Sequence, residues 1–256
     1  MTSLDALILG IVEGITELLP VSSTGHLILA SSLLGITQSD FLKTFEIAIQ
    51  SGAILAVVAL YWRSFLDTET LKRVIVAFIP TGIIGLALYK VVKTYLLGNE
   101  AVVLWALALG GVALIVFELF YKEGDETRDS VGAITYKQAV VIGLFQSLAI
   151  IPGVSRSAAT IVGGLLTSGI KRATIVEFSF LLAVPTMGAA TGLDLLKSAG
   201  SFSSEQFLPL AVGFVVSFVV AVASIKFLLS FVRSHSFIAF GIYRILVALF
   251  FFLLVL

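Results

Sequence analysis

The chain has 256 residues, of which 59% are hydrophobic and 12% are charged, and its mean hydropathy is +1.11. This composition excludes an ordinary soluble domain and indicates an integral membrane protein. The 16 basic and 16 acidic side chains balance, so there is no electrostatic reason to expect nucleic-acid binding. The chain has no cysteine, which excludes disulfides and thiolate chemistry.

The apolar segments predict helices, since they are long and lack the short alternating pattern of strands. The first of them does not look like a cleavable signal peptide, because no basic segment leads it and Glu13 and Glu17 interrupt it. A spanning helix needs roughly 20 apolar residues. Six segments are long enough: residues 45–62, 74–97, 101–121, 174–196, 207–232 and 237–256.

Four other apolar segments are too short to cross a membrane alone: residues 4–19, 27–36, 138–151 and 158–170. They occur in two pairs, and proline and glycine interrupt the chain between the members of each pair. We interpret each pair as a re-entrant helical hairpin with a polar tip. Irregular backbone at membrane depth is tolerated only where protein or water covers it, which suits a functional site.

The two polar tips are related by a shift of 133 residues, which sets Glu13 on Gln146 and Ser22 on Ser155. Each half then holds one hairpin and three spanning helices, and an odd number of crossings inverts the second half. The predicted fold is therefore an all-α polytopic membrane protein with two inverted-topology repeats. It forms one domain over 1–256, with repeats at about 1–121 and 138–256 and a hydrophilic connector at about 122–137.

The first tip begins with two carboxylates, Glu13 and Glu17, which are four residues apart and so share one face of a helix. Two like charges in an apolar segment repel each other, so one carries a proton, or a cation or arginine lies between them. An acid/base pair and a divalent-metal site both use this arrangement. The alternative is a pair that only hydrogen-bonds between helices.

Ser22, Ser23, Thr24, Gly25 and His26 follow directly. Small hydroxylated residues before an apolar helix provide N-caps, and the free N–H groups of a helix start favour an anion. Simple capping is the alternative interpretation, and we expect at least one hydroxyl to cap. Capping does not explain His26, for which we favour a functional role over a structural one.

The second tip contains Gly153, Ser155, Arg156, Ser157 and Thr160. Arginine stays charged and binds phosphate oxygens as a bidentate fork, the hydroxyls add donors, and the glycine lets backbone approach a ligand. Arg156 also suits neutralisation of Glu17, and the two roles are compatible. Together the tips suit phosphoryl transfer on a substrate that is partly lipid, namely a phosphate or diphosphate on a long apolar tail.

These motifs resemble the bacterial undecaprenyl-diphosphate phosphatase family, also called the bacitracin-resistance family. Its first motif, Glu/Gln-xxx-Glu followed by Pro-Val-Ser-Ser-Thr-Gly-His, is met by Glu13, Glu17 and residues 20–26. Its second motif, Pro-Gly-x-Ser-Arg-Ser-x-x-Thr, is met by residues 152–160. The resemblance extends over essentially the whole chain.

The resemblance implies a hydrolase that converts undecaprenyl diphosphate to undecaprenyl phosphate, which recycles the lipid carrier for peptidoglycan synthesis and confers bacitracin resistance. It also implies a multi-pass protein of the bacterial inner membrane, with its site open toward the periplasmic or outer side, and dependence on Mg²⁺ or Ca²⁺. The charges of the loops alone do not assign the orientation. The expected partners are the lipid substrate and membrane lipids, and a homodimer is considered as the assembly.

Glu17 is assigned the central acid/base role, with Glu13 assisting it or sharing a metal. Ser23 is the favoured nucleophile, because it precedes the Thr24–Gly25 break, and Ser22 is the alternative. His26 activates the hydroxyl or protonates the leaving group. A metal-bound water that attacks directly is an equal alternative to a serine nucleophile.

In the second tip, Arg156 holds the transferred phosphate, and Ser155, Ser157 and Thr160 secure the diphosphate. The rival function is an inverted-repeat transporter or flippase of a lipid phosphate, which needs a clamp but no nucleophile. A structural or regulatory membrane protein would leave the tips unexplained. Glu46 and Gln50 either line the cavity or bridge helices. Three charged residues that lie near helix ends or snorkel receive no role: Asp194, Lys226 and Arg244.

Overall fold

The computed structural model describes residues 1–37, 39–96, 98–122, 129–167, 169–198 and 204–255. Within these ranges the chain forms ten α-helices and no β-strand. The helices are α1 (Ser3–Thr16), α2 (Ser23–Leu33), α3 (Asp40–Tyr61), α4 (Thr68–Val91), α5 (Glu100–Phe120), α6 (Tyr136–Gln146), α7 (Arg156–Leu165), α8 (Arg172–Ser198), α9 (Ser204–Phe231) and α10 (Ile238–Val255). A π-helical turn, η1 (Val92–Leu96), extends α4, and two 3₁₀ turns, η2 (Val131–Ala133) and η3 (Ser147–Ile150), flank α6.

Polar caps fix where several helices begin. Thr2 and Thr135 each form a capping box with the residue three positions later, and the Asp67 carboxylate accepts from the Thr70 backbone N–H at 3.0 Å. Glycines with positive φ follow several helix ends, as Gly35 does after α2. The helix boundaries therefore follow local sequence chemistry, and they lie close to the predicted ones.

Four helices of the described chain are long and apolar enough to cross a membrane: Phe41–Tyr61, Thr68–Val91, Glu100–Phe120 and Phe207–Phe231. These match four of the six predicted spans. The other two predicted spans coincide with α8 and α10. In α10, the apolar helix Ile238–Leu254 is shorter than the four spanning helices. The Asp194 side chain and residues 123–128 of the predicted connector lie outside the described part.

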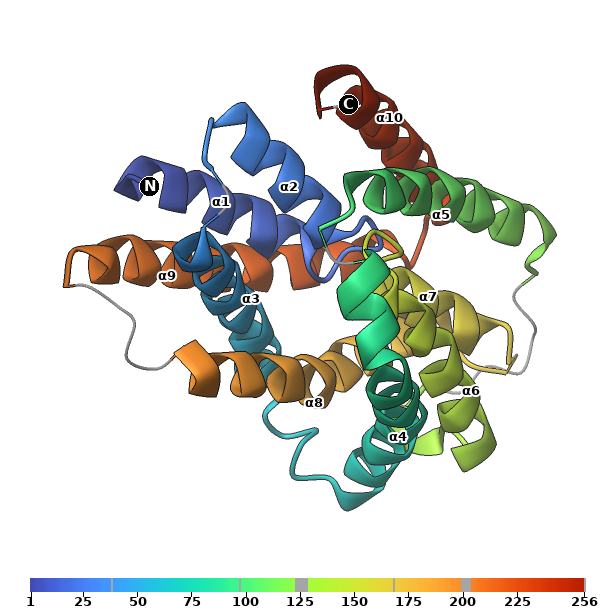
Figure 1. Ribbon diagram of the computed structural model, residues 1–256. Helices are drawn as coiled ribbons and strands as arrows, with labels where there is room; N and C mark the ends of the chain where they lie inside the picture. Colours follow the sequence, from blue (N-terminus) through green and yellow to red (C-terminus); the bar gives the residue numbers. More distant parts are fainter. Residues whose placement is uncertain (38, 97, 123–128, 168, 199–203, 256) are drawn as a thin grey trace.

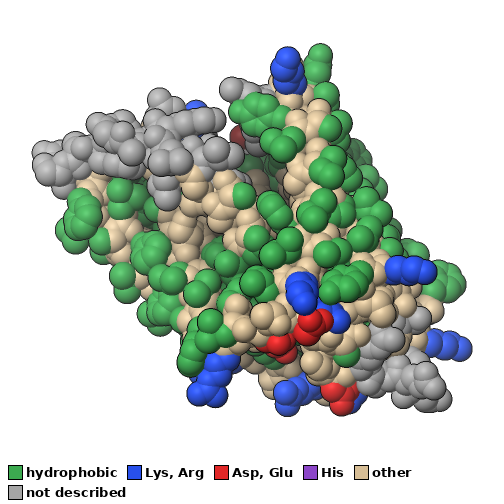
Figure 2. Space-filling view, turned by 90° about the horizontal axis from the view of Figure 1, so that it is seen from below, with side chains coloured by type: hydrophobic (Ala, Val, Ile, Leu, Met, Phe, Trp, Pro, Cys, Tyr) green, Lys and Arg blue, Asp and Glu red, His purple; other side chains and the backbone are tan. Residues whose placement is uncertain are grey.

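The outer surface is unusually apolar. Large hydrophobic side chains of α4 and α5 point outward, with Leu86 80% and Phe120 82% exposed. Figure 2 shows hydrophobic side chains over most of one face, with charged side chains gathered mainly toward its lower edge. A soluble monomer rarely exposes so much apolar surface, whereas a lipid bilayer covers it.

The two short helix pairs lie on opposite sides of the molecule (Figure 1). Helix α1 packs along α9, and α6 packs in the same way along α4. Each contact is close because a glycine faces backbone: a Cβ on Gly10 would lie 2.7 Å from the Gly213 carbonyl oxygen, and one on Gly143 would lie 2.0 Å from that of Ala77. Helices α3 and α8 contact each other, as do α5 and α10. This packing brings the α1–α2 turn and the turn before α7 together near the centre.

Candidate active site

A cavity of roughly 230 Å³ lies where the two turns meet. Its lining includes seven residues that the sequence predicted for the site: Glu17, Ser22, Ser23, Thr24, Gly153, Ser155 and Arg156. Residues from two segments more than 120 positions apart therefore share one polar space. The rest of the lining is partly apolar, with Ile150, Ile151 and Met187 among its members.

The backbone takes the same rare conformation in both turns. Ser22 and Ser155, the residues directly before α2 and α7, have φ of 72° and 76°, and they are the two non-glycine residues with positive φ in the described chain. Such a conformation costs of order 1–3 kcal/mol and concentrates at functional sites. The Ser155 hydroxyl accepts from the Ala158 N–H at 3.3 Å, whereas Ser22 makes no side-chain cap. Ser155 therefore caps α7 in the second turn, whereas the hydroxyl cap expected in the first turn is not found at its N-cap residue, Ser22.

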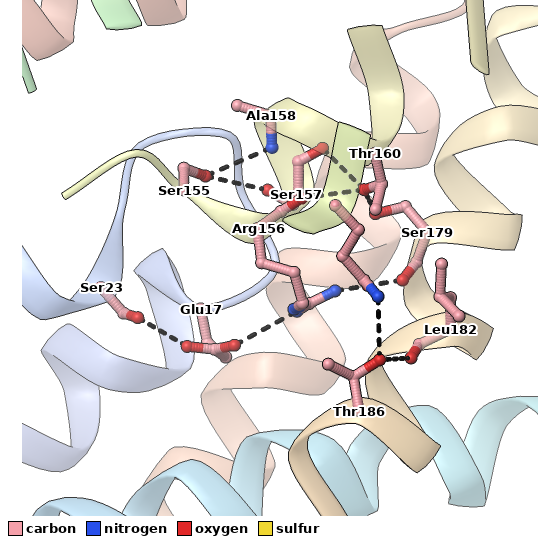
Figure 3. A network of polar contacts seen from close by, with 11 residues as sticks. Glu17, Ser23, Ser155, Arg156, Ser157, Ala158, Thr160, Ser179, Leu182 and Thr186 are labelled. Carbon is pink, nitrogen blue, oxygen red and sulfur yellow. Dashed lines mark hydrogen bonds and ion pairs between the residues drawn. The ribbon is translucent and has the colours of Figure 1, made fainter. Parts of the chain in front are cut away.

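A chain of hydrogen bonds connects the two turns (Figure 3). The Ser23 hydroxyl donates to Glu17 Oε2 at 2.5 Å, and Arg156 Nη2 donates to Glu17 Oε1 at 3.2 Å. Arg156 Nη1 continues the chain to the Ser179 carbonyl oxygen at 3.1 Å. The Glu17 and Arg156 side chains are only 4% and 9% exposed. A hydroxyl, a carboxylate and a guanidinium are therefore held in contact and almost shielded from solvent.

Glu13 lies one helical turn before Glu17 and is completely buried. Neither of its carboxylate oxygens accepts a hydrogen bond from a donor group, and the side chain that it meets is the Glu17 carboxylate. A buried carboxylate without a partner is costly, and a proton or a cation relieves the cost. In the described ranges no three His, Cys, Asp or Glu side chains come together as a metal cluster. Any cation here would thus rely on Glu13 and Glu17, together with phosphate oxygens and water, as Mg²⁺ commonly does.

One hydrogen-bond donor of Arg156 is not used within the protein. Its Nε–H is buried and has no partner, while the two terminal nitrogens bind Glu17 and Ser179. Helices α2 and α7 both begin at the cavity, so two helix N-termini direct their positive ends and free N–H groups toward it. The site is therefore suited to bind a group with several negative oxygens.

Besides Glu13, four of the predicted site residues are not part of the cavity lining. Thr160 is buried and hydrogen-bonds to the Ser179 hydroxyl, while the Ser157 hydroxyl lies 3.4 Å from that of Ser155. A Cβ on Gly25 would lie 2.7 Å from the Leu107 side chain, so this glycine permits helix contact. The fourth, His26, is 9% exposed. The roles assigned to these residues stay predictions.

Both nitrogen atoms of the His26 ring form hydrogen bonds. Nδ1 lies 2.7 Å from the Ser22 carbonyl oxygen and Nε2 lies 2.8 Å from the Tyr243 hydroxyl. A carbonyl oxygen only accepts, so Nδ1 carries the hydrogen, and in the neutral ring Nε2 accepts from Tyr243. His26 thus holds the unusual Ser22 backbone in place.

Three further polar residues of the cavity lining were not predicted from the sequence: Thr81, Gln146 and Thr186. Gln146 Nε2 donates to Thr81 Oγ1 at 2.8 Å and to Thr186 Oγ1 at 3.1 Å, and all three residues line the cavity with Gln50. The Gln146 Oε1 atom is buried without a partner. The repeat could have pointed to Gln146 as a site residue, because the shift of 133 residues aligns it with Glu13.

The expectation that Arg244 lies near a helix end or snorkels was wrong. Its side chain is fully buried and is the largest of the fully buried side chains in the described chain. It donates to five backbone carbonyl oxygens, those of Pro20, Ala106, Leu107, Gly153 and Val154. The signal was its position, since it lies well inside an apolar segment and charges at such depth usually face protein.

The fold and the cavity together define a helical membrane protein with the groups that phosphoryl transfer requires. Residues 6–250 match the family model described as Bacitracin resistance protein BacA, and the chain belongs to this family. The family expected from the two motifs is thereby confirmed.

Relatives match over nearly their whole length. The Undecaprenyl-diphosphatase of Sulfurihydrogenibium sp. (strain YO3AOP1) is 54% identical over 253 residues, which cover 99% of each chain. The Undecaprenyl-diphosphatase of Persephonella marina (strain DSM 14350 / EX-H1) is 53% identical over 257 residues, which cover 100% of each. That of Aquifex aeolicus (strain VF5) is 52% identical over 250 residues, which cover 97% of each.

Proposed function

We propose that the chain hydrolyses undecaprenyl diphosphate to undecaprenyl phosphate and inorganic phosphate, the activity for which its relatives are named. The observation that carries this proposal is the contact of the Ser23 hydroxyl, the Glu17 carboxylate and the Arg156 guanidinium in one buried cavity. A nucleophile within hydrogen-bond reach of a base, beside an anion clamp, is the arrangement expected for covalent phosphoryl transfer.

In the proposed reaction, Glu17 takes the proton as the Ser23 oxygen attacks the terminal phosphorus. The bond between that phosphorus and the bridging oxygen breaks, Glu17 returns the proton to the leaving oxygen, and undecaprenyl phosphate leaves. Glu17, again ionised, then takes a proton from a water that attacks the phosphorus of the serine phosphate. The bond between phosphorus and the Ser23 oxygen breaks, that oxygen takes the proton back from Glu17, and inorganic phosphate is released. The geometry favours Ser23 over Ser22, because Ser23 donates to Glu17 whereas the Ser22 backbone is held by His26.

Arg156 and the starts of α2 and α7 would stabilise the negative charge on the transferred group. Ser155 lines the cavity beside Arg156, while Ser157 and Thr160 support the turn from behind. The apolar residues Ile150, Ile151 and Met187 would contact the first part of the prenyl chain.

A divalent cation, Mg²⁺ or Ca²⁺, belongs to this proposal. The unpartnered oxygens of Glu13 fit a cation, and Glu13 with Glu17 would hold it. When bound, the cation would supply positive charge that offsets the charge of the diphosphate.

We also propose the two inverted repeats and the two re-entrant hairpins. Two observations support this arrangement. Helix α1 contacts α9 as α6 contacts α4, and Ser22 and Ser155 have similar positive φ angles. The proposed location is the bacterial inner membrane, with the cavity open toward the outer side. A homodimer stays a prediction.

The test is phosphate release from a C55 or shorter prenyl diphosphate by the pure protein in detergent, with Mg²⁺ or Ca²⁺ present. Release by the wild type and its loss in Ser23→Ala supports the proposal, whereas a folded wild type that releases none refutes it. A transporter or flippase would bind the lipid without releasing phosphate. Capture of a serine phosphate on residue 23 by mass spectrometry after acid quench would distinguish the covalent scheme from direct attack by water.

A further inference from the structure

The structure assigns a positioning role to two adjacent residues of α10, Tyr243 and Arg244, which lie outside the cavity lining and hold the two turns in register. This inference rests on the proposed function for its activity readout. It concerns residues to which neither the sequence motifs nor the proposed chemistry gave a role.

Arg244 binds both turns at once. Nη1 donates to the carbonyl oxygens of Pro20 at 3.4 Å and Val154 at 2.9 Å, and Nη2 donates to that of Gly153 at 3.0 Å. Pro20 belongs to the first turn, and Gly153 and Val154 belong to the second. One guanidinium therefore joins the backbone segments that carry Ser23 and Arg156.

The same guanidinium is anchored on α5. Nη2 also donates to the Ala106 carbonyl oxygen at 3.0 Å, and Nε donates to that of Leu107 at 3.4 Å. Arginine has five N–H donors in a rigid planar fork, and here all five have a carbonyl acceptor. A lysine has three donors on a flexible stem, so it would satisfy only part of this set.

The neighbouring Tyr243 acts on the first turn alone. Its hydroxyl contacts His26 Nε2 at 2.8 Å, the two rings stack with an interplanar angle of 9°, and His26 Nδ1 binds the Ser22 carbonyl oxygen. This chain of contacts ends on Ser22, one of the two non-glycine residues with positive φ in the described chain. Tyr243 thus helps to keep a backbone conformation that the chain would otherwise leave.

Gly110 on α5 provides the space for the guanidinium. A Cβ at this position would lie 2.1 Å from Arg244 Nη2 and 2.8 Å from Cζ. An alanine there would displace the guanidinium without changing any residue of the turns. Gly85 on α4 is the matched control, since a Cβ there meets nothing within 4 Å.

The functional test compares kcat and KM of Arg244→Met, Arg244→Lys and Gly110→Ala, each normalised to folded protein. A misplacement of about 1 Å costs around 100-fold in rate, so Arg244→Met should lower kcat about 100-fold with a smaller change in KM. Arg244→Lys should recover part of the loss. Gly110→Ala should lower kcat in the wild-type background but add no further loss to Arg244→Met, because methionine lacks the atoms that the new methyl group would meet.

The second readout needs no activity. Hydrogen–deuterium exchange should speed up in peptides covering residues 17–26 and 150–158 in Arg244→Met, and only in residues 17–26 in Tyr243→Phe. Gly85→Ala should leave both regions unchanged. Unchanged exchange in both regions of Arg244→Met, or wild-type kcat in the folded variant, would overturn the inference. If the wild type releases no phosphate while exchange rises as described, the proposed function fails and the positioning role stands.

Discussion

Glu17 and Arg156 form an ion pair of 3.2 Å across a sequence separation of 139 residues. Each is the charged residue of its own turn, so the pair forms only when both turns are in place. The pair also places the Ser23 hydroxyl, through Glu17, beside the guanidinium.

Glu17→Gln and Ser23→Ala are each expected to lower kcat by at least 10²–10⁴-fold, the usual effect of removing a general base or its nucleophile. Phosphate release from a prenyl diphosphate measures the loss. The matched control is Glu100→Gln, which neutralises a carboxylate in the exposed first turn of α5. Near-normal turnover in Glu17→Gln or in Ser23→Ala would remove that residue from its assigned role. Ser22→Ala should lose less activity than Ser23→Ala.

Arg156→Ala should lower kcat/KM by about 10²–10³-fold, since one charge-stabilising donor set is lost. Arg156→Lys should restore little, because lysine cannot bind Glu17, the Ser179 carbonyl and a phosphate in one planar arrangement. Steady-state kinetics with detergent-solubilised substrate decide the point. A lysine variant with wild-type kcat/KM would show that only the positive charge matters.

Glu13→Gln should lower the affinity for the activating cation and have a smaller effect on the stability of the fold. Its carboxylate oxygens are buried and unpartnered, and glutamine is the residue at the matching position of the second turn. The concentration of Mg²⁺ or Ca²⁺ that gives half-maximal activity should rise about tenfold or more, as expected when a metal-site contact is lost. The exposed Glu69→Gln variant is the control. An unchanged cation titration would exclude Glu13 as a ligand.

The buried pair of Glu118 and Arg172 should matter for stability and not for catalysis. Arg172 binds Glu118 through both terminal nitrogens, and Glu118 also accepts from the Phe237 N–H at 3.1 Å, which ties α5, α8 and the start of α10 together. Glu118→Gln should cost roughly 1–3 kcal/mol, because a neutral amide replaces the carboxylate that accepts the charge-assisted hydrogen bonds of Arg172. Thermal unfolding in detergent measures this effect. The exposed pair of Lys72 and Glu69 is the control, and its disruption should leave the unfolding temperature nearly unchanged.

Much of the helix pattern and the main site residues could be predicted from the sequence. Apolar segment length gave the helices, and the breaks at Pro20 and Gly153 gave the turns, because both signals are local. The carboxylates, hydroxyls and arginine stood out because polar groups are costly in apolar segments. The family expected from the two motifs is confirmed by the family match, and the expected phosphatase function is the one for which the relatives are named.

The remaining features depend on contacts between distant elements. Arg244 carries no local motif, and its role is visible only when α10 lies beside α5 and both turns. Likewise, Thr160 and Ser157 carry the same hydroxyl as Ser23, but their positions on α7 direct them behind the cavity. Hydroxyl chemistry alone therefore did not separate the residues that line the cavity from those that support it.

The positive φ of Ser22 is expected to lower the stability of the fold while it supports activity, because it positions the first turn. Glycine adopts positive φ without steric cost, so Ser22→Gly should raise the unfolding temperature while it lets the turn sample conformations that misplace Ser23. Comparison of unfolding temperature and kcat for this variant would show the two effects moving in opposite directions. Selection for thermal tolerance alone would then erode turnover at this position, whereas selection for lipid-carrier recycling would keep a strained serine in the chain.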